Sequence, residues 1–125
     1  MSRPTDFTPK DRLQLALEVG YRCVNEECGI STTAFDSITN RLVCIGVAAH
    51  DVAASPKGPR ANPDMSVEKK RSISNGAWLC RNCAEMVDRL PERFPVGTIS
   101  GWQRAAKNDL LYRVTGIAKE PDNDE

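Results

Sequence analysis

Hydrophobic positions recur at helical spacing in two long stretches of the chain. The first begins after Thr8 and Pro9 and ends at Gly20, and the second begins after Thr98 and continues to Val114. Thr is a good helix cap, Pro suits the first helical position, and apolar residues three or four apart form one face of a helix. The pattern predicts an N-terminal helix and an amphipathic C-terminal helix.

Between these helices, residues 41–49 form the only long run of Val, Ile and small residues, which favours a buried strand. The following loop, residues 55–63, contains three prolines and a glycine, so regular structure is excluded there. Long loops in small domains usually carry function. A short helix is expected from Ser66 to about Ser74, and another is expected to begin at or near Cys83. The elements predict an α+β fold.

Composition limits the size and class of the protein. The 125 residues suit one compact domain, and only 6% are aromatic, so the apolar core is modest. Lys+Arg and Asp+Glu both total 17, which excludes a uniformly basic nucleic-acid-binding protein. The last six residues carry four acids and no base. We therefore expect a domain over residues 1–115 and an acidic, disordered tail over 116–125. Without a membrane-length apolar run or a signal peptide, we expect a cytoplasmic protein with no membrane partner.

Four cysteines form two close pairs, Cys23-x4-Cys28 and Cys80-x2-Cys83, separated by 51 residues. Two such pairs on tight turns can place four thiolates around one zinc ion. The alternatives are two disulfides, which a reducing cytosol disfavours, or a redox pair at Cys80 and Cys83, which leaves the first pair unexplained. A structural zinc is favoured, and its binding energy compensates for the modest core. Cys44 lies within the predicted strand, where we expect it to be a buried small hydrophobe.

The single histidine, His50, lies where the predicted strand meets the Pro-rich loop, and Asn75 follows 25 residues later. A lone histidine is more often structural than catalytic, but functional side chains commonly emerge at strand ends. The segment after it has a local excess of positive charge that could contact nucleic-acid phosphates, although charge alone favours a solvated loop and helix surface. The basic residues of this segment are Lys57, Arg60, Lys69, Lys70 and Arg71.

The order of these motifs resembles the HNH endonuclease family, and most closely its zinc-stapled members, found as small bacterial or phage domains and in defence proteins. The resemblance runs over about residues 20–105 and rests on the cysteine pairs, on Gly-Val-Ala-Ala-His at 46–50 and on the segment from Asn75 to Asp88. It implies a ββα-metal (His-Me finger) core with a structural zinc, flanked by N- and C-terminal helices. It also implies that His50 is the general base, that Asn75 orients the loop carrying it, and that Mg or Mn is the catalytic ion.

The sequence departs from the family pattern at two positions that usually hold ligands of the catalytic ion. Ala84 stands where a histidine should follow the second cysteine pair, and Ala49 precedes the general base. Asp88, one helical turn beyond Ala84, and Asp51, beside His50, are candidate substitutes, because carboxylates suit a hard divalent ion. The competing interpretations are a helix-surface salt bridge for Asp88 and loop solvation for Asp51.

Three functions follow from these observations. The first is a metal-dependent endonuclease that hydrolyses phosphodiester bonds in DNA with His50 as general base. The second is a catalytically degenerate HNH-like zinc module that binds nucleic acid or a protein without cleavage. The third is a zinc-stabilised interaction domain that docks a protein partner through the apolar stripe of its C-terminal helix, Ile99 to Val114.

Overall fold

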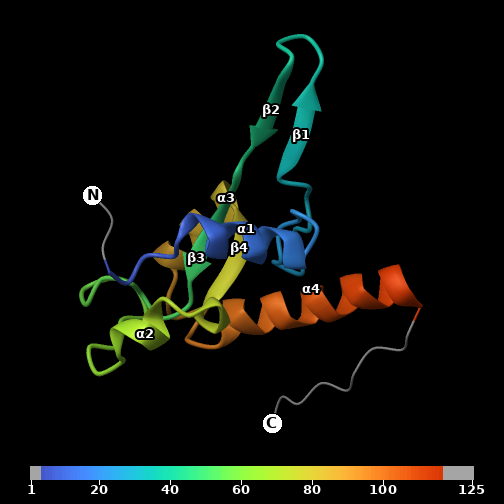
Figure 1. The fold of residues 1–125 in the computed structure, drawn as a ribbon. Helices are drawn as coiled ribbons and strands as arrows, with labels where there is room; N and C mark the ends of the chain where they lie inside the picture. The colour runs from blue at the N-terminus through green and yellow to red at the C-terminus, as the bar shows by residue number, and fades with distance from the viewer. Residues whose placement is uncertain (1–3, 117–125) are drawn as a thin grey trace.

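The computed structural model describes residues 4–116, and the expected acidic tail lies almost entirely outside them. Over this part of the chain, four α-helices, one 3₁₀ helix and two small antiparallel sheets confirm the predicted α+β class (Figure 1). No helix among residues 4–116 is long and apolar enough to cross a membrane.

The predicted strand over 41–49 is present but changes partner midway. It is divided into β2 (Arg41–Cys44) and β3 (Gly46–His50), with Ile45 between them. β2 pairs with β1 (Thr33–Asp36) in a hairpin that projects from the rest of the molecule, and β3 pairs with β4 (Gly76–Cys80) (Figure 1). Strand β1 was not predicted, because its four residues carry no clear apolar alternation. The hairpin also corrects the expectation for Cys44, which is exposed rather than buried.

The first and last helices begin close to their predicted starts. α1 (Pro9–Glu18) is capped by the Thr8 side chain, which accepts a hydrogen bond from the Asp11 N–H. α4 (Thr98–Thr115) is preceded by Gly97 in the left-handed region (φ +99°), so Thr98 is the first helical residue and not the cap that was predicted. Gly97 lets the chain turn sharply into the helix without strain from a side chain.

Two short helices, the strand β4 and one longer helix lie between β3 and α4 along the chain. After the loop come α2 (Val67–Lys70), shorter than predicted, and the 3₁₀ helix η1 (Ile73–Asn75), and then β4 leads directly into α3 (Arg81–Arg89). The cap of α3 is Cys80, whose sulfur accepts from the Cys83 N–H. The order is therefore strand, loop, antiparallel strand, helix.

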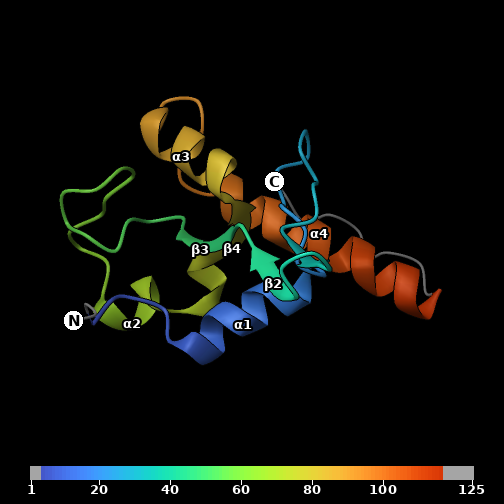
Figure 2. The same ribbon diagram turned by 90° about the horizontal axis from the view of Figure 1, so that it is seen from above.

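The core lies around the β3–β4 sheet. Seen from above, α1 and α3 lie on opposite sides of this sheet (Figure 2). Buried side chains from β4, α3 and α4 meet there, among them Leu79, Val87 and Ile99. The buried Gln103 ties α4 to the sheet and to α1, because its amide accepts from the Trp78 N–H at 2.9 Å and donates to the Leu15 carbonyl at 3.0 Å.

Candidate metal centre and the pocket beside it

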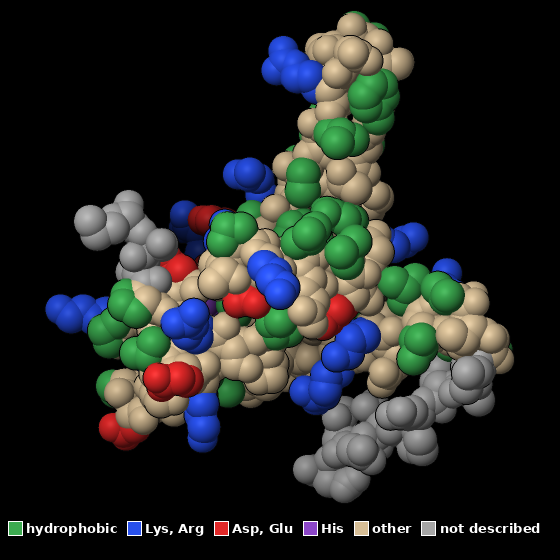
Figure 3. Space-filling view, viewed as in Figure 1, with side chains coloured by type: hydrophobic (Ala, Val, Ile, Leu, Met, Phe, Trp, Pro, Cys, Tyr) green, Lys and Arg blue, Asp and Glu red, His purple; other side chains and the backbone are tan. Residues whose placement is uncertain are grey.

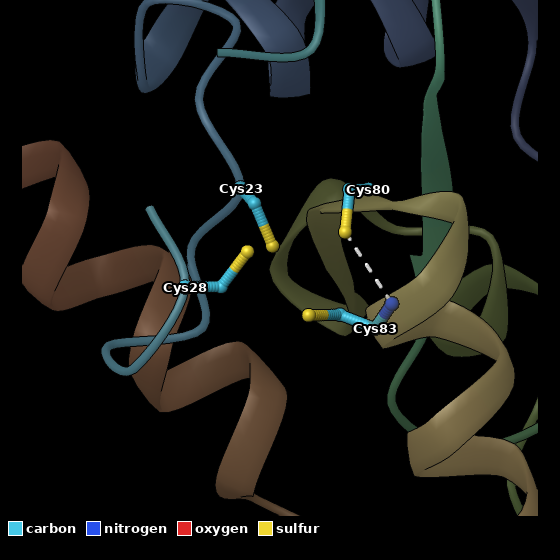
Figure 4. Close-up of side chains that lie close together, drawn as sticks. All are labelled: Cys23, Cys28, Cys80 and Cys83. Carbon is cyan, nitrogen blue, oxygen red and sulfur yellow. Dashed lines mark hydrogen bonds between the residues drawn. The ribbon is translucent and has the colours of Figure 1, made fainter. Parts of the chain in front are cut away.

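The two cysteine pairs meet in space and form a four-sulfur cluster. The sulfur atoms of Cys23, Cys28, Cys80 and Cys83 all lie within 4.8 Å of one another and point toward a common centre (Figure 4). A tetrahedral site with Zn–S bonds of about 2.3 Å has sulfur atoms about 3.8 Å apart, so small movements complete the geometry. Among residues 4–116 this is the only group of three or more Cys, His, Asp or Glu residues placed to hold a metal. The cluster fits a structural zinc ion.

Each cysteine pair is held by its own turn, and Asn25 links the two. The Asn25 carbonyl accepts from the Cys28 N–H at 2.9 Å and closes the first turn, and its side-chain amide donates to the Cys83 sulfur at 3.4 Å. On the second turn the Cys83 N–H donates to the Cys80 sulfur at 3.4 Å (Figure 4). The sequence analysis gave Asn25 no role, and its position within the first cysteine pair is the only signal that points to it.

The chemistry of the thiols also suits a metal. Burial raises the pKa of the Cys23 and Cys83 thiols, because the charged thiolate is poorly solvated inside the protein. Burial acts in the same direction on Cys80, but hydrogen bonds from the backbone N–H and side chain of Cys83 lower its pKa overall. All four cysteines are free thiols, and a bound cation compensates the buried thiolates that a metal site requires.

A cavity of about 270 Å³ lies between the end of β3 and α3, with His50, Ala84 and Asp88 in its wall. The His50 ring stacks on Phe7, with ring centroids 4.0 Å apart, and its Nε2 lies 2.8 Å from the Thr5 carbonyl oxygen. A carbonyl oxygen only accepts hydrogen bonds, so Nε2 carries the proton in this arrangement.

Asn75 makes the contacts expected of a residue that holds the chain after His50. Its side-chain oxygen accepts from the Val52 N–H at 2.8 Å, and its side-chain nitrogen donates to the carbonyls of Val52 and Lys70, both at 2.9 Å. The residue is buried, so each of these bonds is protected from water. Asn75 therefore fixes the backbone that directly follows the end of β3.

Arg60 is not on the solvated loop surface where the sequence analysis placed it. Its side chain is only 3% exposed, and Nε and Nη1 donate to the carbonyls of Asp51 and Val87, both at 2.8 Å. Nη2 donates to the His50 carbonyl at 3.4 Å and to Asp88 Oδ1 at 3.2 Å. The guanidinium group thus joins the end of β3 to α3 from inside the protein, where it is not available to grip phosphate.

The carboxylates proposed as substitute metal ligands have other partners. Asp51 is buried, and its Oδ2 accepts from the Gly97 N–H at 2.8 Å and from the Ser100 hydroxyl at 2.5 Å at the start of α4. Its Oδ1 makes no hydrogen bond within the described residues and lies 3.8 Å from Arg60 Nε. Asp88 pairs with the same guanidinium group, which matches the salt-bridge interpretation. Asp51, Asp88 and His50 do not form a group of three ligands placed around one ion.

The remaining basic residues are divided between surface and interior. Lys57, Lys69 and Arg71 are exposed, whereas Lys70 is buried, which corrects its assignment to a phosphate-binding surface. On α4 the apolar stripe is covered at its start, where Ile99 is fully buried, and open toward its end.

A comparison of the sequence with protein-family models gives no match, and a comparison with curated proteins gives none either.

Proposed function

We propose that the chain is a catalytically degenerate HNH-like module, stapled by zinc, that binds DNA without cutting it. The observation that carries this proposal is the Arg60 guanidinium group, which lies between the end of β3 and α3. In the ββα-metal finger that the sequence resembles, this is the region where a divalent ion is held. In this chain the same region is occupied by the positive charge of the Arg60 side chain.

The order of elements supports the HNH-like part of the proposal. β3, a long loop, the antiparallel β4 and then α3 follow the strand–loop–strand–helix order of a ββα finger. Asn75 holds the backbone after His50, as the resemblance implies for this position. The cysteine cluster ties the N-terminal end of α3 to the turn that follows α1.

Electrostatics disfavour a second cation beside Arg60. Two unit charges about 4 Å apart repel by about 4 kcal/mol at the effective dielectric of a protein surface, and a divalent ion doubles that figure. The carboxylate that would attract such an ion, Asp88, already pairs with the guanidinium group. The Arg60 guanidinium group donates to four acceptors, and an ion would have to displace it from them before it took its place beside Asp88.

The contacts of His50 restrain its ring. The Nε2 proton is held by the Thr5 carbonyl, so the lone pair that a general base would use is on Nδ1. Stacking on Phe7 covers one face of the ring and limits its rotation. These contacts favour a structural role for the histidine.

The DNA-binding part rests on the basic residues that remain exposed, Lys57, Lys69 and Arg71. Such side chains contact phosphates without reading sequence, so binding is expected to weaken steeply as salt is raised.

The test combines a plasmid-nicking assay in Mg²⁺ or Mn²⁺ with a gel-shift assay. We expect no nicking by wild type or His50→Ala, and salt-dependent binding that Lys69→Glu and Arg71→Glu weaken. The matched control is Arg89→Glu, which reverses an exposed charge on α3 away from these residues. Metal-dependent nicking that His50→Ala abolishes without loss of zinc would refute the degenerate function, and absence of DNA binding would refute the binding function.

The endonuclease remains the second candidate because His50, Ala84 and Asp88 line one cavity. The double variant Arg60→Ala with Ala84→His removes the internal cation and restores a ligand at the family position. A gain of metal-dependent nicking in this variant alone is the result expected of a module that lost its ion.

A further inference from the structure

Within residues 4–116, the extended run over residues 41–49 pairs with other strands along one side only. β1 and β4 lie one after the other along that side. The junction is at Ile45, whose N–H donates to the carbonyl of Thr32, next to β1, at 2.7 Å. Its carbonyl accepts from the N–H of Arg81, next to β4, at 2.9 Å. Both partner strands lie to the same side of the run in Figure 1. The opposite side is a continuous strand edge.

Alternation along the strand tells which backbone groups face this edge. In an antiparallel ladder the N–H and C=O of successive residues point to opposite sides. Since the groups of Ile45 point to β1 and β4, those of its neighbours Cys44 and Gly46, and of Leu42 and Ala48 beyond them, point to the open edge. Over residues 4–116 no hydrogen bond reaches these edge-facing groups.

The edge lacks the features that normally prevent strands from pairing. Proteins usually protect edges with charged residues, proline or a bulge, but residues 42–49 contain no charge and no proline. Leu42 is 78% exposed and Ile45 is 41% exposed. Apolar side chains are accordingly visible along the projecting hairpin and at its base (Figure 3). A two-stranded hairpin alone is only marginally stable in water, so such a surface favours a further strand.

Open space adjoins β3 on both faces of the sheet. A cavity of about 700 Å³ lies on the α1 side, with Leu13 and Trp78 in its wall, and the cavity of about 270 Å³ lies on the α3 side. Both reach Val47 and Ala48 of β3. The described chain therefore leaves the edge accessible from both faces of the sheet.

We propose that this edge pairs with the same edge of a second copy of the chain, antiparallel and about a two-fold axis at Ile45. This register places Leu42 opposite Ala48 of the second copy and Cys44 opposite its Gly46. Each of these pairs exchanges two backbone hydrogen bonds, so every free group from 42 to 48 gains a partner. A self-complementary surface of this kind is what a two-fold dimer requires.

The side chains are compatible with the register. Ile45 faces Ile45 of the second copy in a non-hydrogen-bonded pair, where side chains are closest, and Val43 faces its Val47. Because residues 42–49 carry no charge, no like charges are brought together. Arg41 falls opposite Ala49 of the second copy, beyond the paired segment. This inference does not depend on whether the module binds or cuts DNA.

Light scattering coupled to size-exclusion chromatography tests the proposal on the full, zinc-loaded chain. The expected mass is twice the chain mass of 13.8 kDa. Ile45→Lys and Ile45→Glu each place like charges face to face and are expected to give monomers, and mixing the two variants is expected to restore the dimer. Ile38→Glu is the matched control: it charges a 92% exposed residue at the hairpin tip, outside the register, and leaves the dimer intact.

Cross-linking tests the register itself in a Cys44→Ser background. Non-hydrogen-bonded partners have Cα atoms about 4.5 Å apart, within the range of a disulfide. Ile45→Cys is therefore expected to form a covalent dimer under mild oxidation, whereas Val47→Cys alone is not. A zinc-loaded wild-type chain that is monomeric at every concentration overturns the proposal. In that case the candidate partner of the edge is a strand of another protein. A dimer that persists in both Ile45 variants overturns it as well.

Discussion

Replacement of Arg60 by methionine tests whether the guanidinium group is the internal cation that joins the end of β3 to α3. Methionine retains much of the aliphatic length and removes the charge and all N–H donors. The structure shows what is lost: bonds to the carbonyls of Asp51 and Val87, and the ion pair with Asp88.

The expected cost follows from burial. The Asp51 side chain is only 3% exposed, and its Oδ1 accepts no hydrogen bond within the described residues. Removal of Arg60 takes away the neighbouring cation and leaves only the hydrogen bonds that Oδ2 accepts at the start of α4. Loss of one partner of a buried pair costs about 3–5 kcal/mol, and a buried carbonyl left without a donor costs about 1–3 kcal/mol. These contributions overlap, and we expect a loss of about 3–5 kcal/mol, a large part of the stability of a small domain.

The assay is urea denaturation followed by tryptophan fluorescence, with zinc in excess throughout. Arg89→Met is the control, because Arg89 is 76% exposed and pairs with the exposed Glu85, so its loss is expected to cost less than about 0.5 kcal/mol. Adding Asp51→Asn to Arg60→Met removes the uncompensated charge and is expected to recover part of the loss. Equal midpoints for Arg60→Met and Arg89→Met would refute the structural role of the guanidinium group.

Three further changes test the metal centre, the loop anchor and the sheet packing. Cys83→Ser is expected to lose the metal and unfold, whereas Cys44→Ser keeps one zinc ion per chain; elemental analysis and circular dichroism compare them, and zinc-free wild type contradicts the site. Asn75→Ala removes three buried hydrogen bonds and is expected to cost about 2–4 kcal/mol in the same denaturation assay, so an unchanged midpoint argues against the anchor. Gly46→Ala places a Cβ 2.3 Å from the Trp78 ring, so the ring has to move; unchanged near-ultraviolet circular dichroism contradicts this packing.

The sequence alone determined the metal centre and the two long helices. Two close cysteine pairs specify a four-sulfur site because the spacing within each pair brings two ligands to one turn, whatever the rest of the chain does. Thr8 and Pro9 specify the start of α1 for a similarly local reason, through capping and a fixed φ. Signals that act within a few residues survive in any tertiary context.

The tertiary structure decided which charged residues face solvent. Arg60 and Lys70 are in a basic segment for which the sequence favours a solvated surface. Arg60 is nevertheless buried, because it donates to carbonyls at the end of β3 and in α3, 9 and 27 residues away. Asp51 likewise accepts a hydrogen bond from the N–H of Gly97, 46 residues later, directly before the first residue of α4. Burial of a charge depends on partners brought together by the whole fold, and no local pattern records them.

The strand edge depends on the fold for the same reason. The apolar run 41–49 predicts a strand, but only the placement of β1 and β4 on one side shows that its other side is free. The alternation of side chains is local, whereas the pairing of a strand requires partners distant in sequence, here Thr32 and Arg81. The sequence determined the two long helices, the strand over residues 41–49 and the metal ligands, and the tertiary contacts decided which groups remained available to bind anything else.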